Sequence, residues 1–458
     1  MDGQLQGNYM NSPADIKKSN VTKSTYAFIV LIFLIVVLSP VPRAQALAPA
    51  WNYSMATPVI SDVAVSNDGA TIIVAAGKLF IFSKNGDLIK QEPYGDKVVL
   101  TPDGRYAASS FGSTLYFFRT PLIINSTDQQ LVKIWDYEFT TPVRSIDMPD
   151  AGSTIAATTE GSSIYIFTTV DQKLYSDKTF ENAIFKISHD RRRIVGISAD
   201  KLRLYSTNAR VSKSYNLASV SQPEFMFLSQ TIPLIIYNDG PRVHAVDASL
   251  GEELWNVEIS GTLKSLAMNP SGSCIVAGTG NGTIYLYEET GTLNGSYVSG
   301  TTDSLSEGIT DIALSKNGAL VAAGTKDGKV LFLNGGGELR GQYQAPDEIQ
   351  HVAVSGDGSI VIATNRTTVY AFSFGSSIAA PSYYQYIPKN QTPALPNTSS
   401  SNTTTPTQTR TQIPTTITEL PTTYSIIRTP TQSPSSLIIV ACSLVIALIV
   451  LAKKEQGG

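Results

Sequence analysis

The sequence predicts an all-β protein, an eight-bladed β-propeller of four-stranded antiparallel blades. Three observations support this fold class. A turn of the Ser-x-Asp-Gly kind recurs eight times, at intervals of roughly 35 to 48 residues, which is the length of one blade. Asn-Gly or Asp-Gly pairs separate many of the short β-rich runs and are strong hairpin signals. A compact apolar run stands at one fixed place in each unit: LFIF (79–82), LYFF (115–118), IYIF (164–167), LRLY (202–205), VHAV (243–246), IYLY (284–287), VLFL (330–333) and VYAF (369–372).

Residues 308–343 show one unit most clearly. Apolar runs at Ile309–Leu314, Ala319–Ala323 and Val330–Leu333 are separated by turns, and a weaker, more polar run ends at Tyr343. This order predicts a four-stranded meander. The first three runs are expected to be buried between neighbouring sheets, and the fourth is expected to be the outer strand with one face in solvent.

The outer strands also predict how the ring closes. The three tryptophans all begin segments in which apolar and polar residues alternate: Trp51–Met55, Trp135–Phe139 and Trp255–Ile259. The first of these precedes the first unit, whereas the last unit stops after its third strand at Phe374. We therefore expect Trp51–Met55 to be the outer strand of the last blade.

The segments around the propeller (47–380) predict a membrane-anchored protein. Residues 1–46 combine lysines, the apolar run Ala27–Leu38 and Ala44-Gln45-Ala46, which is typical of a secretory signal peptide, with an uncleaved signal anchor as the alternative. Residues 381–436 are rich in Ser, Thr and Pro and predict a disordered stalk.

The apolar run 437–452 predicts a single transmembrane helix, and 453–458 a cytoplasmic tail that starts with Lys453-Lys454. The expected location is the cell membrane, with the propeller on the extracytoplasmic side.

Charge and cysteine content argue against a nucleic-acid-binding protein and against a disulfide-stabilised protein. With 34 basic and 37 acidic residues, the net charge of −3 gives no footprint for nucleic acid. The two cysteines, Cys274 and Cys442, fall in a predicted blade strand and in the predicted membrane helix, so no disulfide framework is expected.

The repeats resemble those of WD40 and quinoprotein-dehydrogenase-like (PQQ-like repeat) propellers. The resemblance rests on the Ser-x-Asp-Gly turns, on Asn281-Gly282 and Asp327-Gly328 in the second turn, and on Leu254-Trp255 opening an outer strand. It covers roughly residues 51–374. No third strand ends in Trp-Asp, and no adjacent cysteine pair of the quinoprotein enzymes is present, so the resemblance implies a propeller without carrying over enzyme activity. The signal segment, stalk and anchor together resemble archaeal cell-surface proteins.

Eight Asn-x-Ser/Thr sequons make N-glycosylation a prediction for an exported chain. They are Asn52, Asn125, Asn281, Asn294, Asn365, Asn390, Asn397 and Asn402.

No motif for catalysis, cofactor or metal binding is found. The three histidines, His189, His244 and His351, lie in different units without metal-ligand spacing. The turn aspartates Asp68, Asp103, Asp327 and Asp357 each sit beside glycine, where local hydrogen bonding explains them better than calcium. Arg191-Arg192-Arg193 is the one basic cluster and is expected to be a solvated loop.

The sequence therefore predicts a monomeric, non-catalytic binding or scaffold module for an envelope protein or glycan, with no cofactor. The alternative is an extracellular enzyme acting on carbohydrate or peptide at the centre of the propeller. Convergent carboxylates there would favour the enzyme, and small or apolar residues would favour the binder.

Overall fold

The computed structural model describes the propeller and little of its flanks. It describes residues 45–375 except 56–58, 121–130, 149–151, 161, 170–171, 173, 178–183, 188–193, 199–200, 207–209, 218–222 and 301–307. Beyond 375 it describes only β34 (Ile387–Pro388) and β35 (Tyr424–Ser425), which pair with each other.

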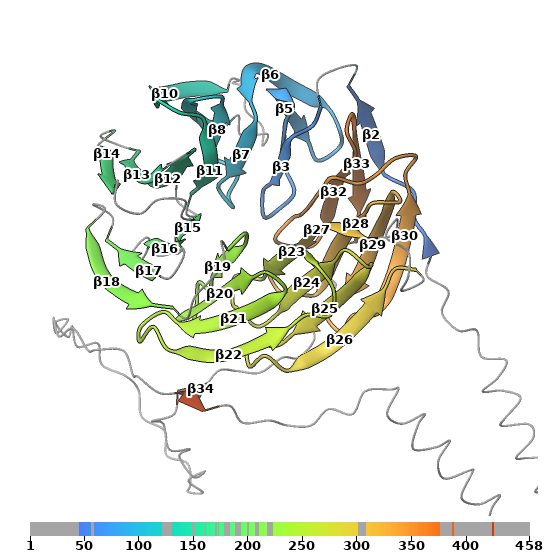
Figure 1. Cartoon of the computed structure of the whole chain (residues 1–458). Helices are drawn as coiled ribbons and strands as arrows, with labels where there is room; N and C mark the ends of the chain where they lie inside the picture. The colour runs from blue at the N-terminus through green and yellow to red at the C-terminus, as the bar shows by residue number, and fades with distance from the viewer. Residues whose placement is uncertain are drawn as a thin grey trace, which may run out of the picture. The chain divides into compact units, whose positions relative to one another are not determined.

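Eight antiparallel sheets are arranged around a common centre, as predicted (Figure 1). Blade 1 contains β3 (Asp62–Val65), β4 (Thr71–Ala75), β5 (Gly77–Ser83) and β6 (Leu88–Gly95). Blade 2 contains β7 (Lys97–Leu100), β8 (Tyr106–Phe111), β9 (Thr114–Arg119) and β10 (Val132–Glu138). Blade 3 contains β11 (Val143–Asp147), β12 (Thr154–Thr159), β13 (Ser162–Thr168) and β14 (Leu174–Asp177). Blade 4 contains β15 (Ile184–Ile187), β16 (Ile194–Ser198), β17 (Lys201–Tyr205) and β18 (Val211–Asn216).

The second half of the ring repeats the pattern. Blade 5 contains β19 (Met226–Leu228), β20 (Leu234–Asp239), β21 (Arg242–Asp247) and β22 (Glu253–Glu258). Blade 6 contains β23 (Leu263–Met268), β24 (Ile275–Thr279), β25 (Thr283–Tyr287) and β26 (Leu293–Val298). Blade 7 contains β27 (Ile309–Leu314), β28 (Leu320–Thr325), β29 (Lys329–Asn334) and β30 (Leu339–Gln344). Blade 8 contains β31 (His351–Val354), β32 (Ile360–Thr364) and β33 (Thr368–Ser373).

The last blade is completed by the N-terminal strand, which confirms the predicted closure. β2 (Trp51–Ser54) pairs antiparallel with β33, with Trp51 opposite Ala371 and Ser54 opposite Thr368. Just before it, β1 (Gln45–Ala46) lies along β30, and the backbone N–H of Leu47 donates to the Gln342 carbonyl at 2.9 Å. Residues 46–54 therefore join blades 7 and 8 at their outer edges.

The recurring first turn is held by the hydrogen bonds predicted for its aspartate. In blade 1, Ser66 Oγ donates to Asp68 Oδ1 at 2.7 Å and accepts from the Thr71 N–H at 3.0 Å. The same local bonds join Thr101 to Asp103 and Ser355 to Asp357. These carboxylates stabilise the hairpins, which explains their spacing without a bound ion.

The core consists of apolar layers between neighbouring blades. The second strand of most blades is fully buried, as in β4, β12, β24, β28 and β32. One cluster, for example, joins Val276 and Leu286 of blade 6 to Val321 and Leu333 of blade 7. This arrangement confirms that inner strands are apolar on both faces.

The three tryptophans share a role between blades as well as a repeat position. Each indole Nε1–H donates to a backbone carbonyl of the next blade: Trp51 to Lys84 at 2.9 Å, Trp135 to Thr169 at 3.4 Å and Trp255 to Glu289 at 2.7 Å. Burial of a large ring together with a satisfied N–H ties the outer strands of consecutive blades together.

Several predicted segments lie outside the described residues: the signal segment up to residue 44, most of the stalk, and the apolar run 437–452 with the tail that follows. Across the part of the chain that is described, no helix has the length and apolarity needed to cross a bilayer.

Candidate binding site on the inner strands

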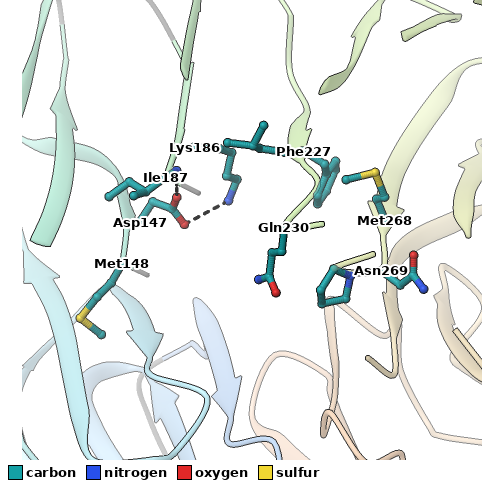
Figure 2. A pocket seen from close by; sticks show the side chains of 10 residues that line it. Asp147, Met148, Lys186, Ile187, Phe227, Gln230, Met268 and Asn269 are labelled. Carbon is teal, nitrogen blue, oxygen red and sulfur yellow. Dashed lines mark hydrogen bonds and ion pairs between the residues drawn. The ribbon is translucent and has the colours of Figure 1, made fainter. Parts of the chain in front are cut away.

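The ends of four consecutive inner strands form a pocket. Its volume is about 180 Å³, and it is lined by residues that close β11, β15, β19 and β23 or follow them in the first turn. We call it the inner pocket. It is lined by Asp147, Met148, Lys186, Ile187, Phe227, Leu228, Gln230, Met268, Asn269 and Pro270 (Figure 2).

The apolar part of the inner pocket is only half-buried. Met148, Phe227, Leu228 and Met268 all retain partial exposure, although they belong to or directly follow strands of a rigid core. The flexible side chains of Met148 and Met268 adapt their shape to an apolar group brought by a ligand. The Gln230 side chain lies between these groups in Figure 2, and its amide offers both a donor and an acceptor.

An ion pair fixes one wall of the inner pocket. Lys186 Nζ lies 3.5 Å from Asp147 Oδ1, while Asp147 Oδ2 accepts the backbone N–H of Ile187 at 2.7 Å. The carboxylate of blade 3 is thus anchored to the backbone of blade 4. The pair therefore orients Lys186 and joins two blades.

Two further carboxylates, Asp62 and Asp311, lie on inner strands at the other side of the ring. Asp62 Oδ2 accepts the Val98 N–H at 2.9 Å, and Asp311 Oδ2 accepts the Val352 N–H at 2.9 Å. In both cases the donor belongs to the next blade. The second oxygen accepts the N–H of the following residue in its own strand at 2.8 Å, so both oxygens of each carboxylate are occupied by backbone donors.

The surroundings of these inner carboxylates shift their protonation. The pKa of Asp311 is raised to about 6, chiefly by burial and also by the nearby charge of Asp62, against the opposing hydrogen bonds from Val352, Ile312 and Ser265. Burial also raises the pKa of Asp62 and lowers that of His351, which lies on β31 between β27 and β3. Because their oxygens accept backbone N–H groups of the next blade, the two carboxylates join neighbouring blades.

The described residues hold no candidate metal centre. Within this part of the chain, no group of three or more His, Cys, Asp or Glu side chains is placed to hold a metal ion. His244 stands in β21, stacked on Tyr237 at 4.9 Å, with Nδ1 2.9 Å from Glu253 Oε2. His189 and Arg191–Arg193 lie outside the described residues.

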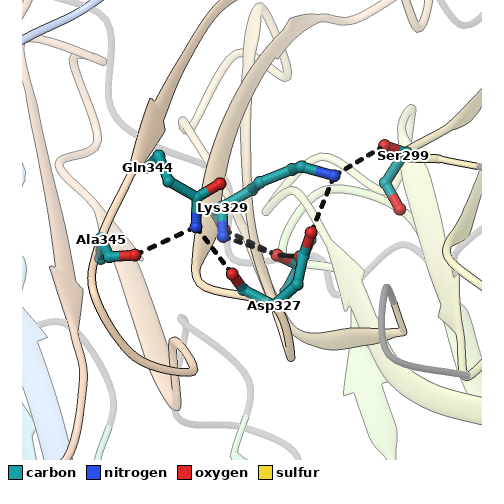
Figure 3. A network of polar contacts seen from close by, with 6 residues as sticks. Ser299, Asp327, Lys329, Gln344 and Ala345 are labelled. Carbon is teal, nitrogen blue, oxygen red and sulfur yellow. Dashed lines mark hydrogen bonds and ion pairs between the residues drawn. The ribbon is translucent and has the colours of Figure 1, made fainter.

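The turn aspartate Asp327 organises a polar network in blade 7 (Figure 3). Lys329 Nζ lies 2.8 Å from Asp327 Oδ2 and donates to the Ser299 carbonyl of blade 6 at 3.3 Å. Burial alone would raise the pKa of Asp327, but the hydrogen bonds from Lys329 and Thr325 outweigh it and hold this pKa below its usual value. The turn interpretation of Asp327 is therefore confirmed.

The described sequons differ in accessibility. Asn52 and Asn294 are exposed and Asn281 is half-buried. Asn365 is 2% exposed, and its Nδ2 donates to the Tyr370 hydroxyl at 3.3 Å, so the folded turn has no room for a glycan on this amide. Asn125, Asn390, Asn397 and Asn402 lie outside the described residues, and their glycosylation stays a prediction.

The residues that build the inner pocket were not singled out by the sequence. Asp147 carried a signal, as did Asp62 and Asp311 outside this pocket, because a carboxylate inside an otherwise apolar inner strand needs a buried partner. Met148, Phe227 and Met268 gave no such signal, since apolar residues in a strand are expected in the core.

Comparisons with known proteins agree with this architecture. A family model described as outer membrane protein assembly factor BamB matches residues 217–386, which include blades 5 to 7 and the three C-terminal strands of blade 8 and are fewer than half of the 458 residues. The expected resemblance to PQQ-like repeat propellers is thereby confirmed. A comparison with curated protein sequences gave no match.

Solved structures of Sqt1 from Chaetomium thermophilum share the fold. One, bound to the N-terminus of the ribosomal protein L10, is 14% identical with a TM-score of 0.60, and covers 72% of this chain and 100% of that chain. A second Sqt1 structure is also 14% identical with a TM-score of 0.60, at 73% and 99% coverage. Identity this low shows the fold alone.

Proposed function

We propose that this protein is a non-catalytic scaffold that holds a partner protein at the inner pocket. The observation that carries the proposal is the pocket itself, which combines four half-buried apolar side chains with an ion pair and a glutamine amide. Binding sites combine apolar contact area with a few fixed polar groups in this way. Rigid strand ends position the side chains, so little ordering free energy is lost on binding.

A protein segment suits this pocket better than a glycan. Met148, Phe227 and Met268 offer apolar contact area to a side chain, whereas Gln230 and Lys186 suit a backbone amide or carboxylate. The related proteins support this choice, because Sqt1 was crystallised with the N-terminus of another protein and BamB is described as an assembly factor.

We further propose that the scaffold is displayed outside the cell on the stalk 381–436 and anchored by the apolar run 437–452. The supporting observations are the lysines before the first apolar run and directly after the last one. The partner would then be an envelope protein.

Site-specific photocrosslinking in cells tests the binding site. A benzophenone amino acid replacing Gln230 should crosslink one defined partner, whereas the same group at Lys316 should not. Lys316 occupies the place of Gln230 in the first turn of blade 7 and is exposed outside the inner pocket. Phe227→Ser in the Gln230 variant should lower the crosslink yield by about tenfold or more, as expected for a binding hot spot.

Equal yields at the two positions, or a yield unchanged by Phe227→Ser in a variant with parental circular dichroism, would contradict the proposal. Turnover of an envelope polysaccharide or peptide that is abolished by Asp62→Asn or Asp311→Asn would instead establish the enzyme alternative.

A further inference from the structure

Two of the polar side chains that line the inner pocket already have partners within the protein. The Asn269 amide is used in its own turn: Nδ2 donates to Ser271 Oγ at 3.0 Å and to Ser273 Oγ at 3.1 Å, and Oδ1 accepts the Cys274 N–H at 3.0 Å. Asp147 accepts a backbone N–H with one oxygen and faces an ammonium group with the other. The acceptor oxygens of both side chains are therefore engaged before a ligand arrives.

Lys186 and Gln230 differ, because they have unused hydrogen-bonding groups. An ammonium group carries three donors, and that of Lys186 has one acceptor among the described residues, Asp147 Oδ1 at 3.5 Å, which is long for a hydrogen bond. The side-chain amide of Gln230 forms no hydrogen bond to another described residue. Both side chains are half-buried. The inner pocket therefore has unused N–H donors from blades 4 and 5.

These donors lie beside apolar side chains in a small space. Figure 2 shows the Lys186 ammonium and the Gln230 amide between Met148 on one side and Phe227 with Met268 on the other. The volume of about 180 Å³ is smaller than the roughly 300 to 1,000 Å³ of pockets for drug-sized ligands. The inner pocket therefore suits one residue of a partner that brings an anionic group and an apolar group together.

We propose that the inner pocket binds the C-terminal residue of its partner, with the α-carboxylate at Lys186 and Gln230. The side chain of that residue is apolar and contacts Met148, Phe227 and Met268. Only at a C-terminus do a carboxylate and an apolar side chain share one carbon atom of a polypeptide, and capture of a C-terminal carboxylate is a known mode of peptide recognition. This inference rests on the proposed function and narrows it from a protein segment to a chain end.

Other anionic groups match the inner pocket less well. An aspartate or glutamate side chain brings a carboxylate without an apolar group, and a phosphate group leaves the apolar walls without a partner. Asp147 and Lys186 are the charged residues that line the pocket, so its preference for a carboxylate comes from unused donors rather than from net charge. Hydrogen bonds from an ammonium to a carboxylate are among the stronger ones in proteins.

Peptide binding to the full chain, purified in detergent, tests the proposal. The probes are fluorescein-labelled Gly-Ser-Gly-Ser peptides extended by Leu, Met or Phe, each made with a free C-terminal carboxylate and with a C-terminal amide. At least one carboxylate peptide should bind at least tenfold more tightly than its amide, because the amide loses a charge-assisted hydrogen bond.

Three lysine variants assign this preference to one side chain. Lys186→Met should remove the difference between carboxylate and amide, whereas Lys186→Arg should keep it. Lys264→Met is the matched control and should bind like the parent, because Lys264 is exposed on β23 and does not line the inner pocket. An unchanged preference in a Lys186→Met variant with parental circular dichroism would overturn the proposal, as would a parent that binds none of the peptides.

Photocrosslinking separates this inference from the proposed function. The partner crosslinked at position 230 should be joined through its last residues when mass spectrometry identifies the crosslinked peptide. A crosslink to an internal segment, or equal affinity for carboxylate and amide peptides, would overturn the C-terminal inference and leave the scaffold function intact. The lack of any defined crosslink would contradict the scaffold function and this inference with it.

Discussion

At the scale of single residues, Gly291 shows how closely consecutive blades approach. Its φ is +78°, and a Cβ built there would lie 2.7 Å from Trp255 of the preceding blade. We expect Gly291→Ala to lower the free energy of unfolding by about 3 kcal/mol or more, since a strained backbone and a displaced indole both contribute.

The control is Gly240→Ala, because Gly240 also has a positive φ, +56°, but a Cβ there would meet nothing within 4 Å. Gly240→Ala should lower the free energy of unfolding by about 1 kcal/mol, because only the backbone strain contributes. Denaturant unfolding of both variants measures the difference, and equal losses would show that the Trp255 contact contributes little.

Asp311 predicts a specific pH dependence of stability. Its pKa is raised from 3.8 to about 6 in the folded protein, so the folded state binds this proton more tightly than the unfolded state. The contribution of Asp311 to stability is therefore largest below pH 4 and is lost as the pH rises to 6, by about 3 kcal/mol.

Asp311→Asn removes this titration. Compared with the parent, its free energy of unfolding should fall less between pH 4 and 6.5, as measured by denaturant unfolding at several pH values. Asn317→Ala, at an exposed turn residue of the same blade that has no titratable group, serves as the control and should keep the parental slope. An Asp311→Asn profile parallel to that of the parent would contradict the pKa shift.

At the scale of elements, the closing strand β2 contributes pairing that no other segment supplies. Deleting residues 47–56 leaves β33 as an unpaired edge and removes Trp51 from its contact with blade 1. We expect the unfolding midpoint to fall by about 10 °C or more and the protein to aggregate, because an exposed edge recruits other chains.

The double variant Asn52→Ala/Ser54→Ala keeps the backbone pairing of β2 and changes only exposed side chains. It should lose no more than about 1 kcal/mol. A deletion variant that melts like the parent and stays soluble would show that β2 is dispensable.

The elements also show what the sequence could and could not predict. Asp-Gly and Asn-Gly turns, the aromatic third strands and the shared place of Trp51, Trp135 and Trp255 determined blade number and ring closure, because these features depend on local chemistry. The inner strands gave no comparable information about the pocket. In β11, β23 and β27 the pairing register shifts after the first residue, as between Ile309 and Asp311, so simple alternation assigns side chains to the wrong face.

At the scale of the whole molecule, the inner pocket is formed by the inner strands of four neighbouring blades, 3 to 6. Because these strands belong to separate sheets, the pocket exists only when the blades are assembled in the ring.

The membrane topology is the remaining whole-molecule prediction. Lysines precede the first apolar run and directly follow the last, so the chain is expected to insert with both lysine-bearing flanks on the cytoplasmic side and the propeller outside. In a Cys442→Ser background, a cysteine replacing the exposed Asn256 should react with a membrane-impermeant maleimide on intact cells. A cysteine replacing Gln456 in the tail should react only after lysis, which makes it the matched control. Labelling of Gln456→Cys on intact cells with protection of Asn256→Cys would reverse the assignment and remove the envelope as the source of the partner.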